Sequence, residues 1–291
     1  MSEKKAAEQS EQLGARAEHV RPNSNGGNGA MRPKIGIALA GGFARGIAHI
    51  GVLRILREAR IPIDMIAGTS VGSLIGTCYC AGVSLEAMES LAHHTTFADF
   101  GRWTPSWLGL ATNLRLEKYL KRLTPVQRFD ELVTPLAITA TYINAGTSVY
   151  YREGPIGPPL RASCAYPGLF VPVQYEGRTL VDGFLTSLVP VEGVRQMGAD
   201  VVIAVYLEAG AIEKPRTFTD VLSRSFTIIQ KQINAEWRRR ADVIIEPDVK
   251  PFVWDDFSKT GELIRAGEEA TLKLLPVIRA AIAAKKVQPS T

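Results

Sequence analysis

The sequence predicts an α/β protein, a three-layer α/β/α domain with a mostly parallel central sheet. Two observations carry this prediction. Short runs rich in Ile, Val and Ala alternate with segments whose apolar residues recur at helical spacing. After residue 31, only short turns marked by Gly, Pro or Asp separate these segments. Strands that alternate with helices favour a parallel sheet covered by helices on both faces.

Two consecutive units of strand, turn and helix open the folded part. In the first, Lys34–Ala40 is a buried strand, Gly41–Gly46 is a turn, and a helix follows in which apolar residues recur at i, i+3, i+4 and i+7 from Val52. The second unit comprises, in order, the strand Ile63–Ala67, the turn Gly68–Gly72 and the helix Ser73–Ala81.

Further elements continue the alternation of strand and helix. We expect strands at Leu136–Tyr142, Thr147–Arg152 and Val201–Tyr206, and helices at Ser84–Ala92, Leu116–Leu123 and Phe218–Arg239.

The first thirty residues differ in composition from the rest. Residues 1–30 are rich in Glu, Lys, Gln, Asn, Ser and Gly and end in a low-complexity run, so we expect a disordered tail. The tail lacks the apolar core of a secretory signal peptide, so the expected compartment is the cytoplasm. Residues 31–291 are expected to form one domain.

Net charge and cysteine content limit the kinds of partner and cofactor that we expect for the chain. The net charge of +5 alone is compatible with several kinds of partner. The densest cationic run, Arg238–Arg240, lies where positive charge complements a helix C-terminus, and we predict no nucleic-acid partner. Cys78, Cys80 and Cys164 lie in apolar sequence and are expected to be reduced packing residues. We predict neither a metal nor another cofactor.

The segment Gly68-Thr69-Ser70-Val71-Gly72 fits the pattern G-x-S-x-G. In this pattern a serine occupies a sharp turn between a strand and a helix, and both glycines avoid steric clashes there. The turn directs the Ser70 hydroxyl outward at a helix N-terminus, where unpaired N–H groups stabilise negative charge. Ser70 is therefore our candidate nucleophile, with a plain tight turn as the alternative.

The turn Gly41–Gly46 has three interpretations. A dinucleotide-binding loop needs a second glycine where Phe43 stands, which disfavours nucleotide binding. An oxyanion hole is the better interpretation, because backbone N–H groups of Gly41, Gly42 and Phe43 would lie beside Ser70 on a neighbouring strand end. A merely structural turn is the third possibility.

A serine hydrolase also needs a base, and the usual histidine is hard to find. His19 lies in the tail, His93 and His94 end a polar helix, and His49 is expected to have a structural role. The remaining candidate is Asp182, a carboxylate that ends a short apolar strand and precedes Gly183. On these features alone it could equally be a turn aspartate.

The combined pattern resembles the patatin-like phospholipases and esterases. Five segments match in the family's order: Gly41–Gly46 leading into Ala48–Leu53, Gly68–Gly72, Arg161–Val173, Val181–Gly183, and a terminal block from Ile245 to Gly267. They lie within residues 34–270 of the expected domain. The resemblance implies a patatin-like fold and a Ser-Asp dyad without histidine, in which Ser70 is the nucleophile and Asp182 the base.

The resemblance also implies an oxyanion hole from the glycine loop and hydrolysis of acyl esters in lipids, of phospholipase A, lysophospholipase or esterase type. Gly68, Gly72 and Gly183 would support the dyad. Arg45 is expected to brace the glycine loop or to counter the charge of the oxyanion, and an exposed salt bridge is the alternative.

Two positions depart from the family pattern. Glycine is usual where Phe43 stands, and a small residue is common where Phe184 follows Gly183. Phe184 is expected to be tolerated. A Cβ at Phe43 resists positive φ and is expected to misdirect an oxyanion donor. A catalytically weak or inactive binding protein with the same fold is therefore the alternative function.

Two further expectations follow from a lipid substrate. A free aspartate has a pKa of about 3.9 and a histidine about 6.5, so burial must raise the pKa of Asp182 for it to act as a base. The segment Phe97–Leu110 holds two of the four tryptophans, and we expect it to cap the site or to contact a membrane surface peripherally. Packing in the core is the alternative for this segment.

Overall fold

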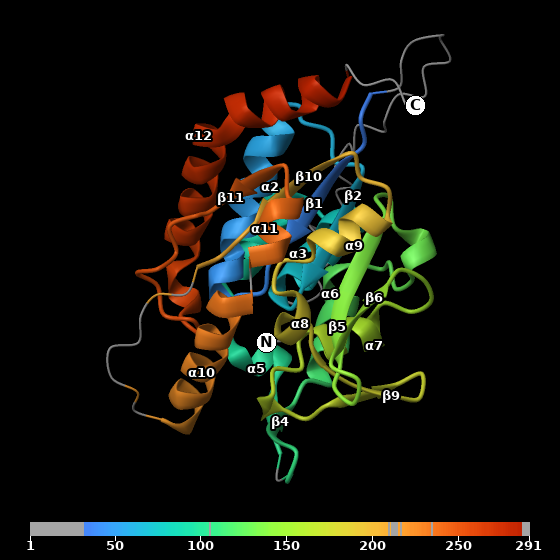
Figure 1. Cartoon of the computed structure of the whole chain (residues 1–291). Helices are drawn as coiled ribbons and strands as arrows, with labels where there is room; N and C mark the ends of the chain where they lie inside the picture. The colour runs from blue at the N-terminus through green and yellow to red at the C-terminus, as the bar shows by residue number, and fades with distance from the viewer. Residues whose placement is uncertain are drawn as a thin grey trace, which may run out of the picture.

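The computed structural model describes residues 32–104, 106–208, 210, 215, 217–233 and 235–286 (Figure 1). The expected disordered tail, residues 1–30, and His19 within it lie outside these residues.

One large sheet organises the described chain. Its eight strands follow the order β11-β10-β1-β2-β5-β9-β8, and β6 pairs with β5. The strands are β1 (Ile35–Leu39), β2 (Met65–Thr69), β5 (Leu136–Tyr142), β6 (Thr147–Tyr151), β8 (Val173–Tyr175), β9 (Arg178–Asp182), β10 (Val201–Val205) and β11 (Val243–Ile245). The pairings from β11 to β5 are parallel, and those of β6, β8 and β9 are antiparallel. The prediction of a mostly parallel sheet is therefore confirmed.

Helices cover both faces of this sheet. On one face lie α2 (Ala48–Glu58), α3 (Val71–Cys80) and α12 (Thr260–Lys286), and Figure 1 shows α12, in red, running along α2. On the other face lies α9 (Val191–Gln196), which packs on β1 and β2. The three-layer α/β/α architecture predicted from the sequence is the one observed.

The side chains of β1 and of the following residue, Ala40, alternate between the two helical layers. Ile35, Ile37 and Leu39 belong to the larger core cluster under α2 and α3, whereas Ala38 and Ala40 belong to the smaller cluster under α9. Successive side chains of a strand point to opposite faces, so bulky residues fill one side and small ones admit α9 closely on the other.

The remaining elements surround this framework. The helices are α4 (Leu85–Ala92), α5 (Phe97–Phe100), α6 (Arg115–Leu123), α7 (Gly157–Ser163), α8 (Phe184–Ser187), α10 (Phe218–Ile233) and α11 (Ala235–Arg240). Short 3-10 helices are η1 (Phe43–Ile47), η2 (Phe129–Glu131) and η3 (Phe257–Lys259). A second sheet joins β3 (Arg102–Trp103), β4 (Gly109–Thr112) and β7 (Gly168–Phe170).

Some boundaries differ from the expectations. The single helix expected at Phe218–Arg239 is described as α10 and α11, on either side of residue 234, which lies outside the described part. Four of the six residues of the expected turn Gly41–Gly46, from Phe43 on, belong to the 3-10 helix η1, a tight helical form that leads directly into α2. Within the described residues, no helix is both long and apolar enough to cross a bilayer.

Strand register brings two distant segments together on β5. Thr139 pairs with Thr69 at the end of β2, and the next residue, Ala140, pairs with Asp182 at the end of β9. Both residues also pair with β6, so β2 and β9 occupy the same edge of β5. The ends of β2 and β9 therefore meet.

Candidate active site

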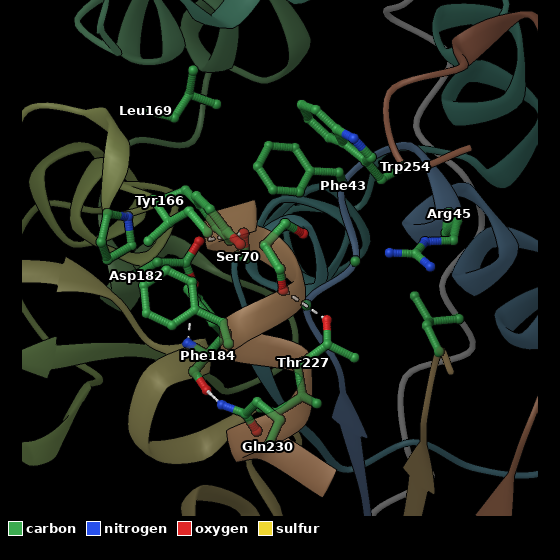
Figure 2. Close-up of a pocket in the computed structure, with 18 of the residues that line it drawn as sticks. Phe43, Arg45, Ser70, Tyr166, Leu169, Asp182, Phe184, Thr227, Gln230 and Trp254 are labelled. Carbon is green, nitrogen blue, oxygen red and sulfur yellow. Dashed lines mark hydrogen bonds between the residues drawn. The ribbon is translucent and has the colours of Figure 1, made fainter. Parts of the chain in front are cut away.

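Ser70 occupies the sharp turn between β2 and α3. Its φ is 54° and its ψ is −123°, a conformation that side chains rarely adopt. Two hydrogen bonds hold it. The Ser70 N–H donates to Ser163 Oγ at 2.8 Å. The Ser70 hydroxyl donates to Asp182 Oδ2 at 2.7 Å, as Figure 2 shows. Ser163 Oγ also bonds Ser73 Oγ at 2.8 Å. Hydrogen bonds thus fix the strained residue Ser70 through both its backbone and its side chain.

The two glycines of this turn have the steric role that the motif predicts. A Cβ on Gly68 would lie 2.5 Å from the carbonyl carbon and oxygen of Gly72. A Cβ on Gly72 would lie 2.3 Å from Leu39 O on the neighbouring strand. Neither contact is possible without moving backbone, so only hydrogen fits at these positions.

Asp182 ends β9 and is 1% exposed. The Phe184 N–H donates to Asp182 Oδ1 at 3.0 Å, and the other carboxylate oxygen accepts the Ser70 hydroxyl. A Cβ on Gly183 would lie 2.5 Å from Thr139 O, so this glycine lets the chain turn against β5. Burial raises the pKa of Asp182 to about 7, although both hydrogen bonds oppose that shift.

The described histidines lie elsewhere. His49 is fully buried, and its Nε2 bonds Ala40 O at 2.9 Å. Burial lowers the pKa of His49 to about 4, so the ring is neutral and Nε2 donates this bond. His93 and His94 are exposed at the end of α4. His49 supports the chain directly before the glycine loop.

The glycine loop differs from the expectation at Gly41. The Gly41 N–H donates to Leu188 O at 3.2 Å, so it is already used within the protein. Neither the Gly42 N–H nor the Phe43 N–H donates to another described residue. Only these two of the three expected groups are free to bind a ligand.

Phe43 adopts the conformation that a Cβ was expected to resist. Its φ is 50°, and its ring makes edge contacts with Tyr166 (centroids 5.2 Å apart) and with Trp254 (4.8 Å). The Ala44 N–H also donates to Trp254 O at 2.9 Å. The left-handed conformation costs about 1–2 kcal/mol, and aromatic contacts of about 0.5–1.5 kcal/mol each offset it. The loop therefore keeps a glycine-like backbone with a phenylalanine.

Arg45 borders the same site without a counter-ion. No ion pair or hydrogen bond joins its side chain to another residue of the described part, and its Nε is buried without a partner. Burial lowers the pKa of Arg45. The exposed salt bridge considered for Arg45 is thus not present among these residues.

A cavity of about 110 Å³ opens beside Ser70 and Asp182. Helix α10 contributes one stripe of residues to it, Leu222, Phe226 and Gln230, and the Gln230 amide donates to Phe184 O. The Phe184 ring stacks on Tyr166 with centroids 4.8 Å apart. The sequence predicted this helix but not that it lines the cavity, and it did not indicate the role of Ser163; the i, i+4, i+8 spacing of the stripe was the available signal for a helix face that packs on the site.

Metal ligands do not gather in the described residues: no three His, Cys, Asp or Glu side chains form a group there. Cys78 and Cys80 are buried, Cys164 is half-buried, and all three are free thiols.

Comparisons with known proteins show which family the chain is similar to. The family model for patatin-like phospholipase matches residues 37–195. An uncharacterized NTE family protein of Mycobacterium tuberculosis is 32% identical over 215 residues, covering 73% of this chain and 56% of that protein. Lysophospholipase nte1 of Aspergillus fumigatus is 30% identical over 209 residues, covering 68% of this chain and 13% of that protein. The chain thus spans about half the length of the mycobacterial relative.

A solved structure agrees at the level of the fold. VipD from Legionella pneumophila superposes with a TM-score of 0.56 at 14% sequence identity, covering 84% of this chain and 67% of that one. With the family model matched over more than half of the sequence, the chain belongs to the patatin-like phospholipase family.

Proposed function

We propose that this protein is a serine lipid acyl hydrolase of phospholipase A, lysophospholipase or esterase type. The observation that carries the proposal is the buried hydrogen bond of 2.7 Å from the Ser70 hydroxyl to Asp182 Oδ2. A nucleophile and a base within hydrogen-bond reach, beside a cavity, are the arrangement that covalent catalysis requires.

In the proposed mechanism, Asp182 accepts the hydroxyl proton as Ser70 Oγ attacks the acyl carbon. The Gly42 and Phe43 N–H groups donate to the oxyanion of the tetrahedral intermediate. The intermediate collapses to an acyl-Ser70 ester, and Asp182 returns its proton to the departing alkoxide. Water then attacks the acyl-enzyme with Asp182 again as base, releasing the fatty acid and restoring Ser70.

The environment of Asp182 suits this role. A base is most effective when its pKa lies near the working pH. With its pKa raised to about 7, Asp182 matches a histidine in basicity while ionising at neutral pH. The family resemblance, together with this geometry, supports a dyad without histidine.

Arg45 is proposed to offset negative charge. Its unpaired guanidinium borders the cavity that also holds Ser70 and Asp182, so an anionic group there would supply the missing partner. We propose that it counters the charge of the oxyanion or of the substrate.

The catalytic domain is proposed to span residues 31–291.

A lipid substrate agrees with the relatives and with the surface. The fungal relative is named a lysophospholipase. Trp103 and Trp107 are 66% and 104% exposed, and Phe218 at the start of α10 is 70% exposed. In Figure 1 the β3–β4 hairpin and α10 lie at the same end of the molecule. We propose that these aromatic side chains contact a membrane surface peripherally.

The second candidate is a binding protein with little turnover; the departure at Phe43 suggested it, although the φ of 50° keeps the loop in a glycine-like conformation. A fluorophosphonate probe and a p-nitrophenyl ester assay separate the two. We expect covalent labelling and ester hydrolysis by the wild type, and loss of both in Ser70→Ala at nearly unchanged thermal stability. Absence of labelling in folded wild-type protein would favour the binding role, and turnover by Ser70→Ala would exclude Ser70 as nucleophile.

A further inference from the structure

Two cavities meet at Ser70, and Phe43 stands between them. The first, of about 110 Å³, is the cavity beneath α10 and is here called the polar cavity. The second, of about 70 Å³, is bordered by Val71, Leu74 and Phe170 and is called the apolar cavity. Ser70, Phe43 and Trp254 line both of them. The contacting rings of Tyr166, Phe43 and Trp254 form the aromatic wall.

The polar cavity can accept hydrogen-bonding groups. Besides the unpaired Arg45, its lining includes polar side chains from two segments: Tyr206, Ser223, Thr227 and Gln230. Figure 2 shows Thr227 and Gln230 along α10, on the opposite side of Ser70 from Phe43 and Trp254. The Thr227 hydroxyl and the Gln230 amide already donate to Ser223 O and Phe184 O, so the Arg45 guanidinium is the donor that a polar alcohol portion of an ester would find there.

The apolar cavity offers almost no free hydrogen-bond donors or acceptors. Asn113 is used, since its amide donates to Arg161 O at 2.6 Å, and Asp255 is exposed. A third cavity of about 60 Å³, here called the far cavity, shares Val71, Leu74 and Phe257 with it and therefore continues it.

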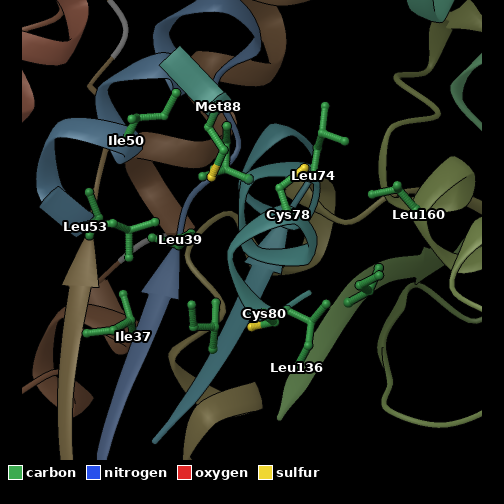
Figure 3. Packing of buried hydrophobic residues seen from close by; sticks show 14 of the residues in the cluster. Ile37, Leu39, Ile50, Leu53, Leu74, Cys78, Cys80, Met88, Leu136 and Leu160 are labelled. Atoms are coloured by element: carbon green, nitrogen blue, oxygen red, sulfur yellow. The ribbon is translucent and has the colours of Figure 1, made fainter. Parts of the chain in front are cut away.

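The far cavity ends deep in the core. Cys78 and Met88 line it, and Figure 3 shows them with Leu74 where α3 faces α4. Its polar side chains Thr95 and Tyr119 bond each other at 2.8 Å. Cavities lined by apolar side chains stay dry and accept hydrocarbon, as a cavity of about 150 Å³ accepts benzene. The apolar and far cavities together thus suit a short run of methylenes.

We infer that Phe43 determines specificity: the aromatic wall directs the acyl chain of the ester into the apolar and far cavities and its alcohol portion into the polar cavity. This inference rests on the proposed function. The acyl carbon bonds to Ser70 Oγ, so the acyl chain and the alcohol oxygen must leave this carbon in different directions. The wall separates the polar cavity from the apolar cavity, both of which Ser70 lines. A glycine at position 43 would remove the central ring and join the cavities.

The test fills the far cavity and measures chain-length preference. We expect the wild-type kcat/KM to rise from p-nitrophenyl butyrate to octanoate by up to about fourfold per methylene. Cys78→Phe should lower kcat/KM for the octanoate at least about tenfold while the butyrate stays within about threefold. Ala92→Leu, which adds a smaller side chain to the same cavity, is the second variant if Cys78→Phe fails to fold.

The matched control narrows the polar cavity instead. Leu222→Phe, on α10, should leave the ratio of octanoate to butyrate unchanged and lower kcat/KM for lysophosphatidylcholine relative to the p-nitrophenyl esters. An unchanged chain-length ratio in folded Cys78→Phe or Ala92→Leu, or a ratio altered by Leu222→Phe, would overturn the inference. Hydrolysis retained by Ser70→Ala would instead refute the proposed function, so the two failures are distinguishable.

Discussion

The turn at Ser70 and the turn at Phe43 are built alike and do different things. Each follows a parallel strand and precedes a helix, and each places a non-glycine residue in the left-handed region, with φ of 54° and 50°. At Ser70 the N–H is accepted by Ser163 and the side chain reaches Asp182. At Phe43 the N–H has no described acceptor and the ring packs on aromatic neighbours.

The difference shows that neighbours, more than local conformation, assign the roles. A satisfied N–H leaves the turn at Ser70 to present its hydroxyl. An unsatisfied N–H makes the turn at Phe43 a donor to whatever occupies the cavity, because backbone groups removed from water need a partner. Changes at each turn should therefore have unequal consequences.

The largest effect is expected where the hydroxyl is activated. Asp182→Asn keeps the shape of the side chain but accepts no proton at neutral pH, so kcat should fall by about 10²–10⁴. Steady-state ester hydrolysis measures the loss. His49→Ala should be far milder, because the ring only supports Ala40 O. Equal losses in folded His49→Ala and Ser70→Ala, with active Asp182→Asn, would replace the dyad by a histidine mechanism.

The next effect is the pH dependence of kcat/KM, which follows the ionisation of Asp182. Because the pKa of Asp182 is about 7, kcat/KM should rise with pH and level off above that value, falling about a hundredfold from pH 8 to pH 5. A profile flat across this range would contradict a titrating base.

The same ionisation has a signed effect on stability. The folded pKa of Asp182, about 7, exceeds its ordinary value of 3.8, so the folded state binds the proton more tightly and stability falls as pH rises between them. Asp182→Asn removes this ionisation. Its melting temperature relative to wild type should therefore be higher at pH 8 than at pH 5, and thermal melts at both values would check the sign.

A smaller effect is expected when the Ser70 N–H loses its hydrogen-bond acceptor. Ser163→Ala leaves the buried Ser70 N–H without an acceptor, which should cost about 1–3 kcal/mol of stability and lower kcat about tenfold. Denaturant unfolding and ester kinetics measure the two quantities. Ser225→Ala, exposed on α10, is the control. Full activity in Ser163→Ala would show that the turn holds its strain without this bond.

The smallest effect on turnover is expected at Phe43. Phe43→Gly relieves positive φ but removes the ring packed against Tyr166 and Trp254, so stability should fall by about 1–3 kcal/mol while kcat on p-nitrophenyl butyrate stays within about threefold. A large loss of kcat at full stability would mean that the ring itself orients the oxyanion donors.

The sequence was informative wherever a residue's role depends on its immediate neighbours. Alternating segments predicted the layers, and G-x-S-x-G predicted the turn at Ser70. The N–H of Gly41 could not be assigned, because its acceptor, Leu188 O, lies far along the chain. The position of α10 over the cavity and the ring contacts that hold Phe43 at positive φ are likewise tertiary. Local pattern predicts an element but not what that element covers.

The register on β5 has a consequence for how this site can change. Ser70 and Asp182 stand 112 residues apart, yet adjacent residues of one strand align the chain segments that carry them. Backbone pairing with β5, a strand that itself lies between them in the chain, sets their spacing, whereas the loops that connect these strands do not. Exposed loops between the strands can therefore lengthen or shorten and leave the two side chains in place. Insertions in those loops should accordingly leave the distance between Ser70 and Asp182 unchanged.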